Sequence, residues 1–247
     1  MNFKDHFSAH AAIYREARPQ YPAALFEFLV AQVATPQLAW DAGCGNGQAS
    51  VDLSRYFNRV IGTDPSAEQI ANATPRPNIE YRIEPAEQSS IADDSVDLVC
   101  VAQALHWFDL PRFHEEARRV LKPGGVVAFW SYADCQVDTE VDAQKDRVYI
   151  DLTGPYWPPE RALVESGYAS LPFPFERIEA PNFYLRMQWN VDRYLAYLRS
   201  WSASQRYMRA LEQDPVSLVE ADLRRAWGSP DRVREVHWDF HLHCGRA

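Results

Sequence analysis

The sequence lacks the features that mark membrane and secreted proteins. It has no run of about 18–20 apolar residues, the length that crosses a bilayer, and its start at Met1 lacks the apolar core of a signal peptide. Its four cysteines stand far apart without a C-x-x-C pair, which is typical of reduced thiols rather than of a disulfide framework. We therefore expect a soluble cytoplasmic protein without a membrane partner.

Basic residues are also scarce. The chain has 25 Lys and Arg residues against 34 Asp and Glu residues, a formal net charge of −9, and no basic block. Because nucleic acids are bound through clustered Lys and Arg side chains, we expect no nucleic-acid partner. A length of 247 residues, 47% of them hydrophobic, predicts one globular core with an elaborated end.

Glycine is sparse overall, with ten residues, but three glycines alternate in the stretch Asp41-Ala42-Gly43-Cys44-Gly45-Asn46-Gly47. An apolar lead-in precedes this stretch and a helical spacing follows it, which predicts a strand, a tight turn and a helix start. Such a turn lets a ligand lie against the backbone. A dinucleotide fingerprint would need glycine where Gln48 stands. A phosphate loop would need lysine, and none lies between Lys4 and Lys122.

The remaining pattern, D-x-G-x-G-x-G, resembles the S-adenosylmethionine-dependent methyltransferases of the Rossmann-like class, specifically a type 11 methyltransferase domain. Other motifs resemble the same family in the same order: Val60–Asp64, Ala86-Glu87 with Ser95–Val99, and Arg119–Gly125. Three flanking segments, at 14–22, 103–109 and 199–202, resemble the branch that contains trans-aconitate methyltransferase.

Strand and helix patterns alternate up to residue 130, which predicts parallel strands with helices on both faces. The resemblance implies a seven-stranded, mostly parallel Rossmann-like sheet with a helical lid inserted near the C-terminus. Proline-rich and aromatic turns then appear, residues 176–188 suggest a hairpin or a bent strand, and Asn190 or Asp192 is placed to cap a helix. We expect an N-terminal cover and cofactor-binding core at 1–133, a substrate lid or subdomain at 134–230, and the final strand at 231–247.

The resemblance implies that S-adenosylmethionine is the cofactor and assigns its binding residues. Asp64 would accept the ribose hydroxyls, although a helix-capping acid ahead of Pro65 would look the same in sequence. The other residues expected at the cofactor are Asp41, Gly43, Gly45 and Gly47 at the methionine portion, Ala86 and Glu87 beside the adenine, and Ala102 and Gln103 beside the sulfonium.

His106 is the candidate catalytic residue. An unperturbed histidine can take a proton from a hydroxyl or amine acceptor, but a carboxylate acceptor needs no base, and His106 would then shape the pocket. The guanidinium of Arg18 or Arg199 would suit a carboxylate acceptor. In the alternative interpretation, these arginines are solvent-exposed and bind no substrate. The residues expected at the substrate are Tyr14, Arg18, Tyr21, Trp107 and Trp201.

A metal site and two other functions were alternatives. His237, Asp239, His241 and His243 share one face of a predicted strand, but such neighbours surround an ion poorly, and we expect no metal. A nicotinamide-dependent oxidoreductase and a non-enzymatic methyltransferase-like binding protein remain open at this point. The leading hypothesis is in-line methyl transfer to a carboxylate or hydroxyl oxygen of a small molecule. The sequence does not indicate an oligomeric state.

Overall fold

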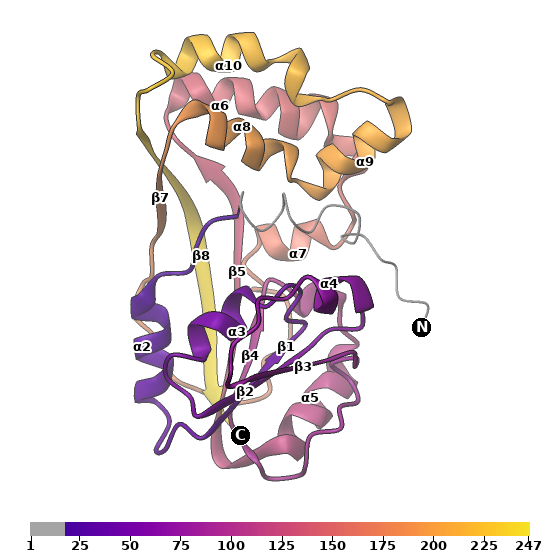
Figure 1. The fold of residues 1–247 in the computed structure, drawn as a ribbon, viewed down its shortest axis with the longest axis vertical. Helices are drawn as coiled ribbons and strands as arrows, with labels where there is room; N and C mark the ends of the chain where they lie inside the picture. Colours follow the sequence, from indigo (N-terminus) through magenta and orange to yellow (C-terminus); the bar gives the residue numbers. More distant parts are fainter. Residues whose placement is uncertain (1–17) are drawn as a thin grey trace.

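The computed structural model describes residues 18–247, which form an α/β fold around one mixed sheet (Figure 1). Most of the expected N-terminal cover, including Tyr14, lies outside the described residues. The sheet order is β3-β2-β1-β4-β5-β8-β6, and β7 also pairs with β8. The strands are β1 Leu38–Ala42, β2 Arg59–Thr63, β3 Ile79–Arg82, β4 Val96–Ala102, β5 Leu121–Gln136, β6 Glu176–Arg177, β7 Leu185–Trp189 and β8 Arg234–Arg246.

The sheet confirms the predicted fold class. Strands β1 to β5 pair in parallel, and β8 runs antiparallel to β5. The sheet has eight strands, one more than expected, because β6 and β7 pair separately with opposite ends of the long β8. Segment 176–188 is therefore an interrupted, bent edge and not a hairpin.

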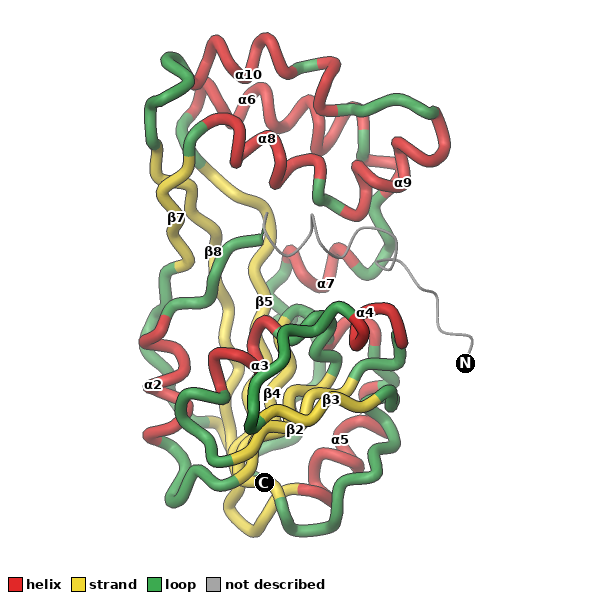
Figure 2. The backbone as a smooth tube through the Cα atoms, in the orientation of Figure 1, coloured by secondary structure: helices red, strands yellow, loops and turns green. Residues whose placement is uncertain are grey.

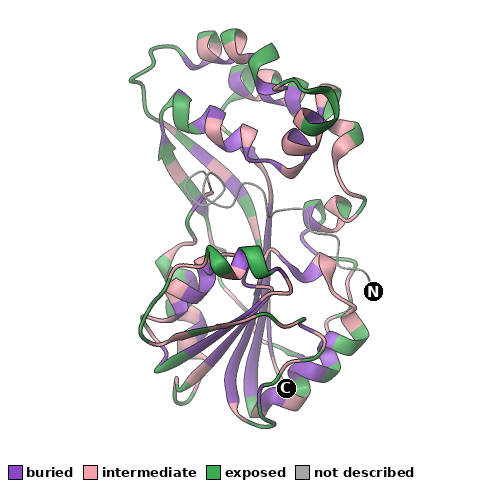
Figure 3. Cartoon of the chain, turned by 45° about the vertical axis from the view of Figure 1, so that its right-hand side comes forward, coloured by how far each residue is buried: buried purple, intermediate pink, exposed green. Residues whose placement is uncertain are grey.

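Helices cover both faces of the parallel part. Along β5, Val127 and Phe129 pack in one hydrophobic cluster with Phe113 of α5 (Leu110–Val120). The alternate residue Trp130 packs in another cluster with Phe26 of α2 (Ala23–Ala31), as the period-two geometry of a strand requires. Figure 3 shows buried residues along the strands and exposed ones on the outer helices. Two shorter helices, α3 Gln48–Leu53 and α4 Ala67–Ala71, follow β1 and β2.

A second group of helices, which we call the helical layer, lies at the far end of the molecule (Figures 1 and 2). The long strands β5 and β8 connect it to the parallel sheet. Strand β5 runs beyond residue 130, where the predicted alternation ends, because it pairs with β8 as far as Gln136. The helical layer comprises α6 Thr139–Asp146, α8 Val191–Arg199, α9 Ser202–Leu211 and α10 Glu220–Trp227. Helix α7, Arg161–Glu165, lies between this layer and the sheet.

The helical layer has its own aromatic core. Asn190 caps α8 as predicted, since its side chain accepts a hydrogen bond of 3.0 Å from the backbone N–H of Arg193. Within residues 18–247, no helix has both the length and the apolarity needed to cross a membrane. The buried aromatic residues of this core are Tyr132, Trp189, Tyr194, Tyr197, Trp201, Trp227 and Trp238.

Candidate cofactor and acceptor site

A cavity of about 660 Å³ opens at the carboxyl ends of β1, β2 and β4 and extends to the helical layer. This is where a parallel sheet binds its ligands, and the volume is that of a small-molecule site. Tyr14 lies outside the described residues. Asp41 and Gly47 are not among the cavity-lining residues. The predicted site residues that do line the cavity are Gly43, Gly45, Asp64, Ala86, Glu87, Ala102, Gln103, His106, Arg18, Tyr21, Trp107 and Trp201.

The three glycines of the turn are left-handed, with φ of 69°, 53° and 83° at Gly43, Gly45 and Gly47. A Cβ at Gly43 would stand 2.7 Å from the Cβ of Ala104, and one at Gly47 would overlap the hydroxyl of Tyr81. At Gly45 the nearest atom to an added Cβ is a side-chain oxygen 3.8 Å away, so its backbone borders open space in the cavity. Gly45 thus allows a ligand close to the main chain, while Gly47 allows the turn itself.

Two acids support this turn in different ways. Asp41 is fully buried beneath it, accepts a 2.6 Å hydrogen bond from the Ser50 hydroxyl, and has its pKa raised to about 6 by burial. Asp64 lines the cavity, and its two oxygens accept backbone N–H groups of Gly45 and Ser66, each at 2.9 Å. Asp64 therefore stabilises the local backbone, as the alternative of a capping acid would require, and it also presents a carboxylate at the cavity wall.

The residues that were predicted beside the adenine and the sulfonium also line the cavity. Glu87 accepts a 2.8 Å hydrogen bond from the backbone N–H of Asp109, which ties its loop to the start of α5. Gln103 has a left-handed backbone with φ of 59°, and its side-chain amide donates to the carbonyl of Tyr132 at 2.7 Å. Since that amide is engaged with β5, Gln103 faces the cavity mainly through its backbone.

Aromatic and basic groups meet at the other end of the cavity. Arg18 donates to the Tyr132 hydroxyl at 3.2 Å, and Tyr21 packs edge-on against the Trp130 ring, with centroids 5.5 Å apart. The rings of His106 and Trp107 lie 4.7 Å apart. This end is therefore suited to an acceptor that combines apolar surface with negative charge.

His106 is held from behind by a tyrosine. Its Nδ1 lies 2.8 Å from the hydroxyl of Tyr168, a buried residue. Burial, and then the nearby positive charge of Arg161, lower the pKa of His106 to about 3. The imidazole is therefore neutral at physiological pH and weakly basic.

Arg161 is a site residue that the sequence analysis missed. Its guanidinium lies 4.7 Å from the ring centroid of Trp157, and its Nε donates to the Tyr149 hydroxyl at 2.9 Å. The side chain lines the cavity and is only 18% exposed. Nothing local distinguishes Arg161 in the sequence, because its position depends on contacts with the rings of Tyr149 and Trp157 that no periodic pattern marks.

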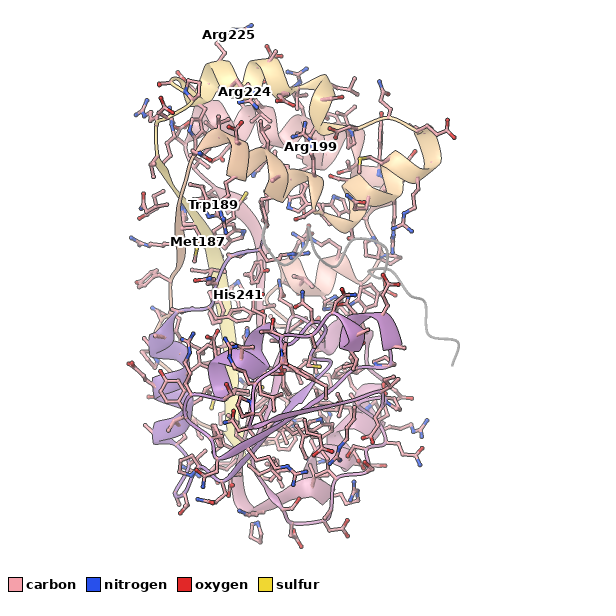
Figure 4. All side chains as sticks on the ribbon, viewed as in Figure 1. Met187, Trp189, Arg199, Arg224, Arg225 and His241 are labelled. Carbon is pink, nitrogen blue, oxygen red and sulfur yellow. The ribbon has the colours of Figure 1, made fainter. Side chains whose placement is uncertain are left out.

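The suggestion that Arg199 assists a carboxylate acceptor is wrong. In α8, Arg199 pairs with Asp214 at 2.7 Å and with Glu220 at 2.5 Å, and it is not among the cavity-lining residues of the described chain (Figure 4). Both partners lie on the α9–α10 side of the helical layer, which nothing in the local sequence of α8 indicates.

The histidine face of β8 also has a structural explanation. His243 Nε2 lies 2.7 Å from the carbonyl of Gly167, and a Cβ at Gly167 would overlap the His241 ring. Among residues 18–247 no group of three His, Cys, Asp or Glu side chains is arranged to hold a metal ion.

Comparison with known proteins identifies the family. A model of the methyltransferase domain matches residues 40–129. A Dictyostelium discoideum protein provisionally named a methyltransferase is 34% identical over 233 residues, which cover 93% of this chain and 89% of the relative. A Saccharomyces cerevisiae protein named as an S-adenosylmethionine-dependent methyltransferase is 36% identical over 138 residues, or 52% of this chain and 46% of that one. The chain belongs to the S-adenosylmethionine-dependent methyltransferases.

A solved structure supports the same membership. A protein from Anaeromyxobacter dehalogenans, provisionally described as a type II methyltransferase, shares 45% identity with a TM-score of 0.86, covering 93% of this chain and 97% of that one. The methyltransferase uses S-adenosylmethionine, and the cavity fits it: Gly45 presents backbone to open space and Asp64 presents a carboxylate. This membership rules out the nicotinamide-dependent alternative and identifies the chain as an enzyme rather than a binding protein.

Proposed function

We propose that this methyltransferase methylates a carboxylate oxygen of a small acid that also carries apolar surface. The observation that carries this proposal is Arg161, a partly buried cation at the aromatic end of the cavity. Only its Nε makes hydrogen bonds to described residues, to Tyr149 and to Glu165. The terminal nitrogens of the guanidinium thus remain available, in the planar fork that matches a carboxylate.

Neighbouring aromatic rings support the same interpretation. Trp157 and Tyr149 lie 4.9 Å apart and both contact the Arg161 guanidinium, which holds its plane in place. Trp201, 5.8 Å from Trp157, continues the apolar wall of the cavity. Glu165 pairs with Nε at 3.3 Å, and the terminal nitrogens make no hydrogen bond to the described residues, so an anionic acceptor that binds them would further stabilise this partly buried cation.

On the donor side, we propose that the turn from Gly43 to Gly47 holds the methionine portion and that Asp64 accepts the ribose hydroxyls. The remaining parts of the S-adenosylmethionine would be lined by Ala86, Glu87, Ala102 and the backbone of Gln103. S-adenosylmethionine supplies a methyl group already activated by its positive sulfur, so the protein needs chiefly to orient the reactants and exclude water.

A hydroxyl acceptor is the second candidate. It would need to lose a proton, and His106, with its pKa lowered to about 3, is a weak base for that purpose. We also propose that segment 134–230 is the substrate lid, next to a core at 1–133 and the final strand at 231–247; the shared cavity lined by Trp157 and Trp201 supports it. Cytoplasmic location and the absence of a nucleic-acid partner stay predictions.

A methyl-transfer assay with labelled S-adenosylmethionine tests the proposal on matched panels of carboxylic acids and phenols. We expect acids to be methylated, and Arg161→Leu to lower kcat/KM by about 10–100-fold, the effect of losing a charged hydrogen bond. The affinity for S-adenosylhomocysteine, measured by calorimetry, should stay within about threefold, since Arg161 is remote from the glycine turn.

Arg199→Leu is the matched control, because it removes a paired arginine of the helical layer outside the cavity. It should leave kcat/KM near that of the wild type. Methylation of phenols but not acids, with Arg161→Leu fully active, would show that the acceptor class is wrong while leaving the enzyme class intact.

A further inference from the structure

The contact between His106 and Tyr168 brings together two short segments. His106 lies in the 3-10 turn η2 (Leu105–Trp107) that follows β4, and Tyr168 follows α7 in a backbone with φ of 61°. Gly167, just before it, is also left-handed, with φ of 61°. Two successive left-handed residues are unusual, and the second carries a large side chain. The chain thus adopts a strained turn that places the phenol against His106.

The hydrogen bond of the phenol decides which proton the histidine carries. The buried Tyr168 hydroxyl makes one hydrogen bond to residues 18–247, to His106 Nδ1 at 2.8 Å. A phenol carries one proton, and a buried polar group needs a partner. If Nδ1 donated its own proton to the phenol oxygen, the phenol proton would be buried without an acceptor, so the phenol donates to Nδ1.

Nδ1 is therefore the acceptor in this pair, and the neutral imidazole carries its own proton on Nε2. Nε2 makes no hydrogen bond to residues 18–247, and His106 lines the cavity. The free N–H thus remains available to a ligand.

Resting on the proposed function, we propose that Tyr168 fixes His106 as the neutral Nε2–H tautomer, which donates a hydrogen bond to the acceptor carboxylate and does not act as a base. Tyr168 is then a positioning residue, and His106 selects acceptors that are already ionised. The attacking carboxylate oxygen gains the methyl group while the methyl–sulfur electron pair returns to sulfur, and no proton moves.

The electrostatic surroundings agree with this assignment. The charged group whose field acts on His106 is Arg161 of α7, and the titratable group in contact with it is Tyr168. A second positive charge on the imidazole is disfavoured beside the guanidinium, so the pKa lies low. Burial raises the pKa of the Tyr168 phenol above its usual range, so that phenol keeps its proton.

Long-range 1H–15N NMR of histidine-labelled protein tests the tautomer directly, without any acceptor. His106→Gln identifies the resonance by its disappearance. We expect an unprotonated Nδ1, a protonated Nε2 and no titration between about pH 5 and pH 8. Tyr168→Phe should mix the two tautomers. A protonated Nδ1, or an imidazole that titrates near its usual pKa, would overturn the proposal.

Kinetics give the second readout. Glutamine places an N–H donor close to the position of Nε2 but has no basicity, so His106→Gln should keep kcat/KM within about threefold of the wild type. His106→Leu should lose about 10–100-fold, as expected for a hydrogen bond to a charged group. If glutamine and leucine are equally inactive, His106 acts as a base and the proposal fails.

The NMR experiment and the methyl-transfer assay together distinguish a failure of this proposal from a failure of the proposed function. If no acid accepts a methyl group but the NMR shows the Nε2–H tautomer, the acceptor class is wrong while the role of Tyr168 stands. If acids are methylated and Nδ1 is protonated, the acceptor class stands and the role of Tyr168 is wrong.

Discussion

The two ends of the cavity, where we propose that the methyl donor and the methyl acceptor bind, are built by different means. We call them the donor end and the acceptor end. At the donor end, one strand and one turn supply Gly43, Gly45 and the buried Asp41 within a few residues of sequence. At the acceptor end, Arg161 begins α7 and Trp201 lies between α8 and α9, and both are ordered by aromatic packing. A donor common to a whole family can be bound by a conserved kind of backbone turn, whereas an acceptor is selected by side chains that remote segments bring together.

Two acids of the sheet, Asp41 and Asp134, differ in whether a cation pairs with them. Asp41, beneath the glycine turn, has no cation among the groups that act on it, and its pKa is raised to about 6. Asp134, at the end of β5, pairs with Lys145 of α6, which is nearly fully buried and also donates to the Cys135 carbonyl at 3.0 Å. The ion pair fastens the helical layer to the sheet, while Asp41 is a source of instability inside the donor end.

Lys145→Ala should have the largest effect on stability. Removing one partner of a buried ion pair leaves an uncompensated charge, and we expect the free energy of unfolding to fall by about 3–5 kcal/mol. Hydrogen exchange should locate the loss: α6, α8 and α10 should lose protection before β1 and β4 do. Denaturant unfolding measures the total.

Arg147→Ala is the matched control. Arg147 lies two residues after Lys145 in the chain, and its ion pair with Asp222 is exposed. Its cost should stay below about 1 kcal/mol. An equal loss in both variants, or uniform loss of protection across the sheet and the helical layer, would show that Lys145 does not fasten the two regions together.

Asp41 has no cation beside it, so Asp41→Asn should stabilise the protein, by an amount that depends on pH. The folded pKa of Asp41, about 6, lies above its ordinary value of 3.8, so its contribution to stability is full below pH 3.8 and is lost as pH rises through 6. A shift of this size corresponds to about 3 kcal/mol. The variant should therefore gain about that much relative to the wild type between pH 4 and pH 7.

The check is denaturant unfolding of both proteins at several pH values across that window. Asparagine keeps an acceptor for the Ser50 hydroxyl, so the two proteins should be similar at the acid end. A difference that does not change with pH would mean that Asp41 titrates normally in the folded protein.

The same contrast explains how far sequence predicted the structure. The α/β class was predictable, and so were the strand before and the helix after the glycine turn at 41–47, because periodicity and glycine spacing act over a few residues. Arg161 and the true position of Arg199 were not, because neither the ring contacts of Arg161 nor the ion pairs of Arg199 follow from periodicity or glycine spacing. The length of β5 was also missed, since its extension is determined by pairing with β8 more than 100 residues later.

Asp64→Ala should weaken cofactor binding with the smallest change in stability of the three. Asp64 accepts the Gly45 and Ser66 backbone N–H groups and borders the cavity, so the substitution should loosen the turn and remove the partner that we propose for the ribose. Loss of about 1.5–3 kcal/mol in charged hydrogen bonding corresponds to about 10–100-fold weaker binding of S-adenosylhomocysteine by calorimetry. Asp52→Ala, which removes a carboxylate in α3 that pairs with Arg55 outside the cavity, should bind within about twofold of the wild type. Equal affinities for the Asp64 and Asp52 variants would mean that the donor end does not rely on this carboxylate, and that its backbone turn alone holds the ligand.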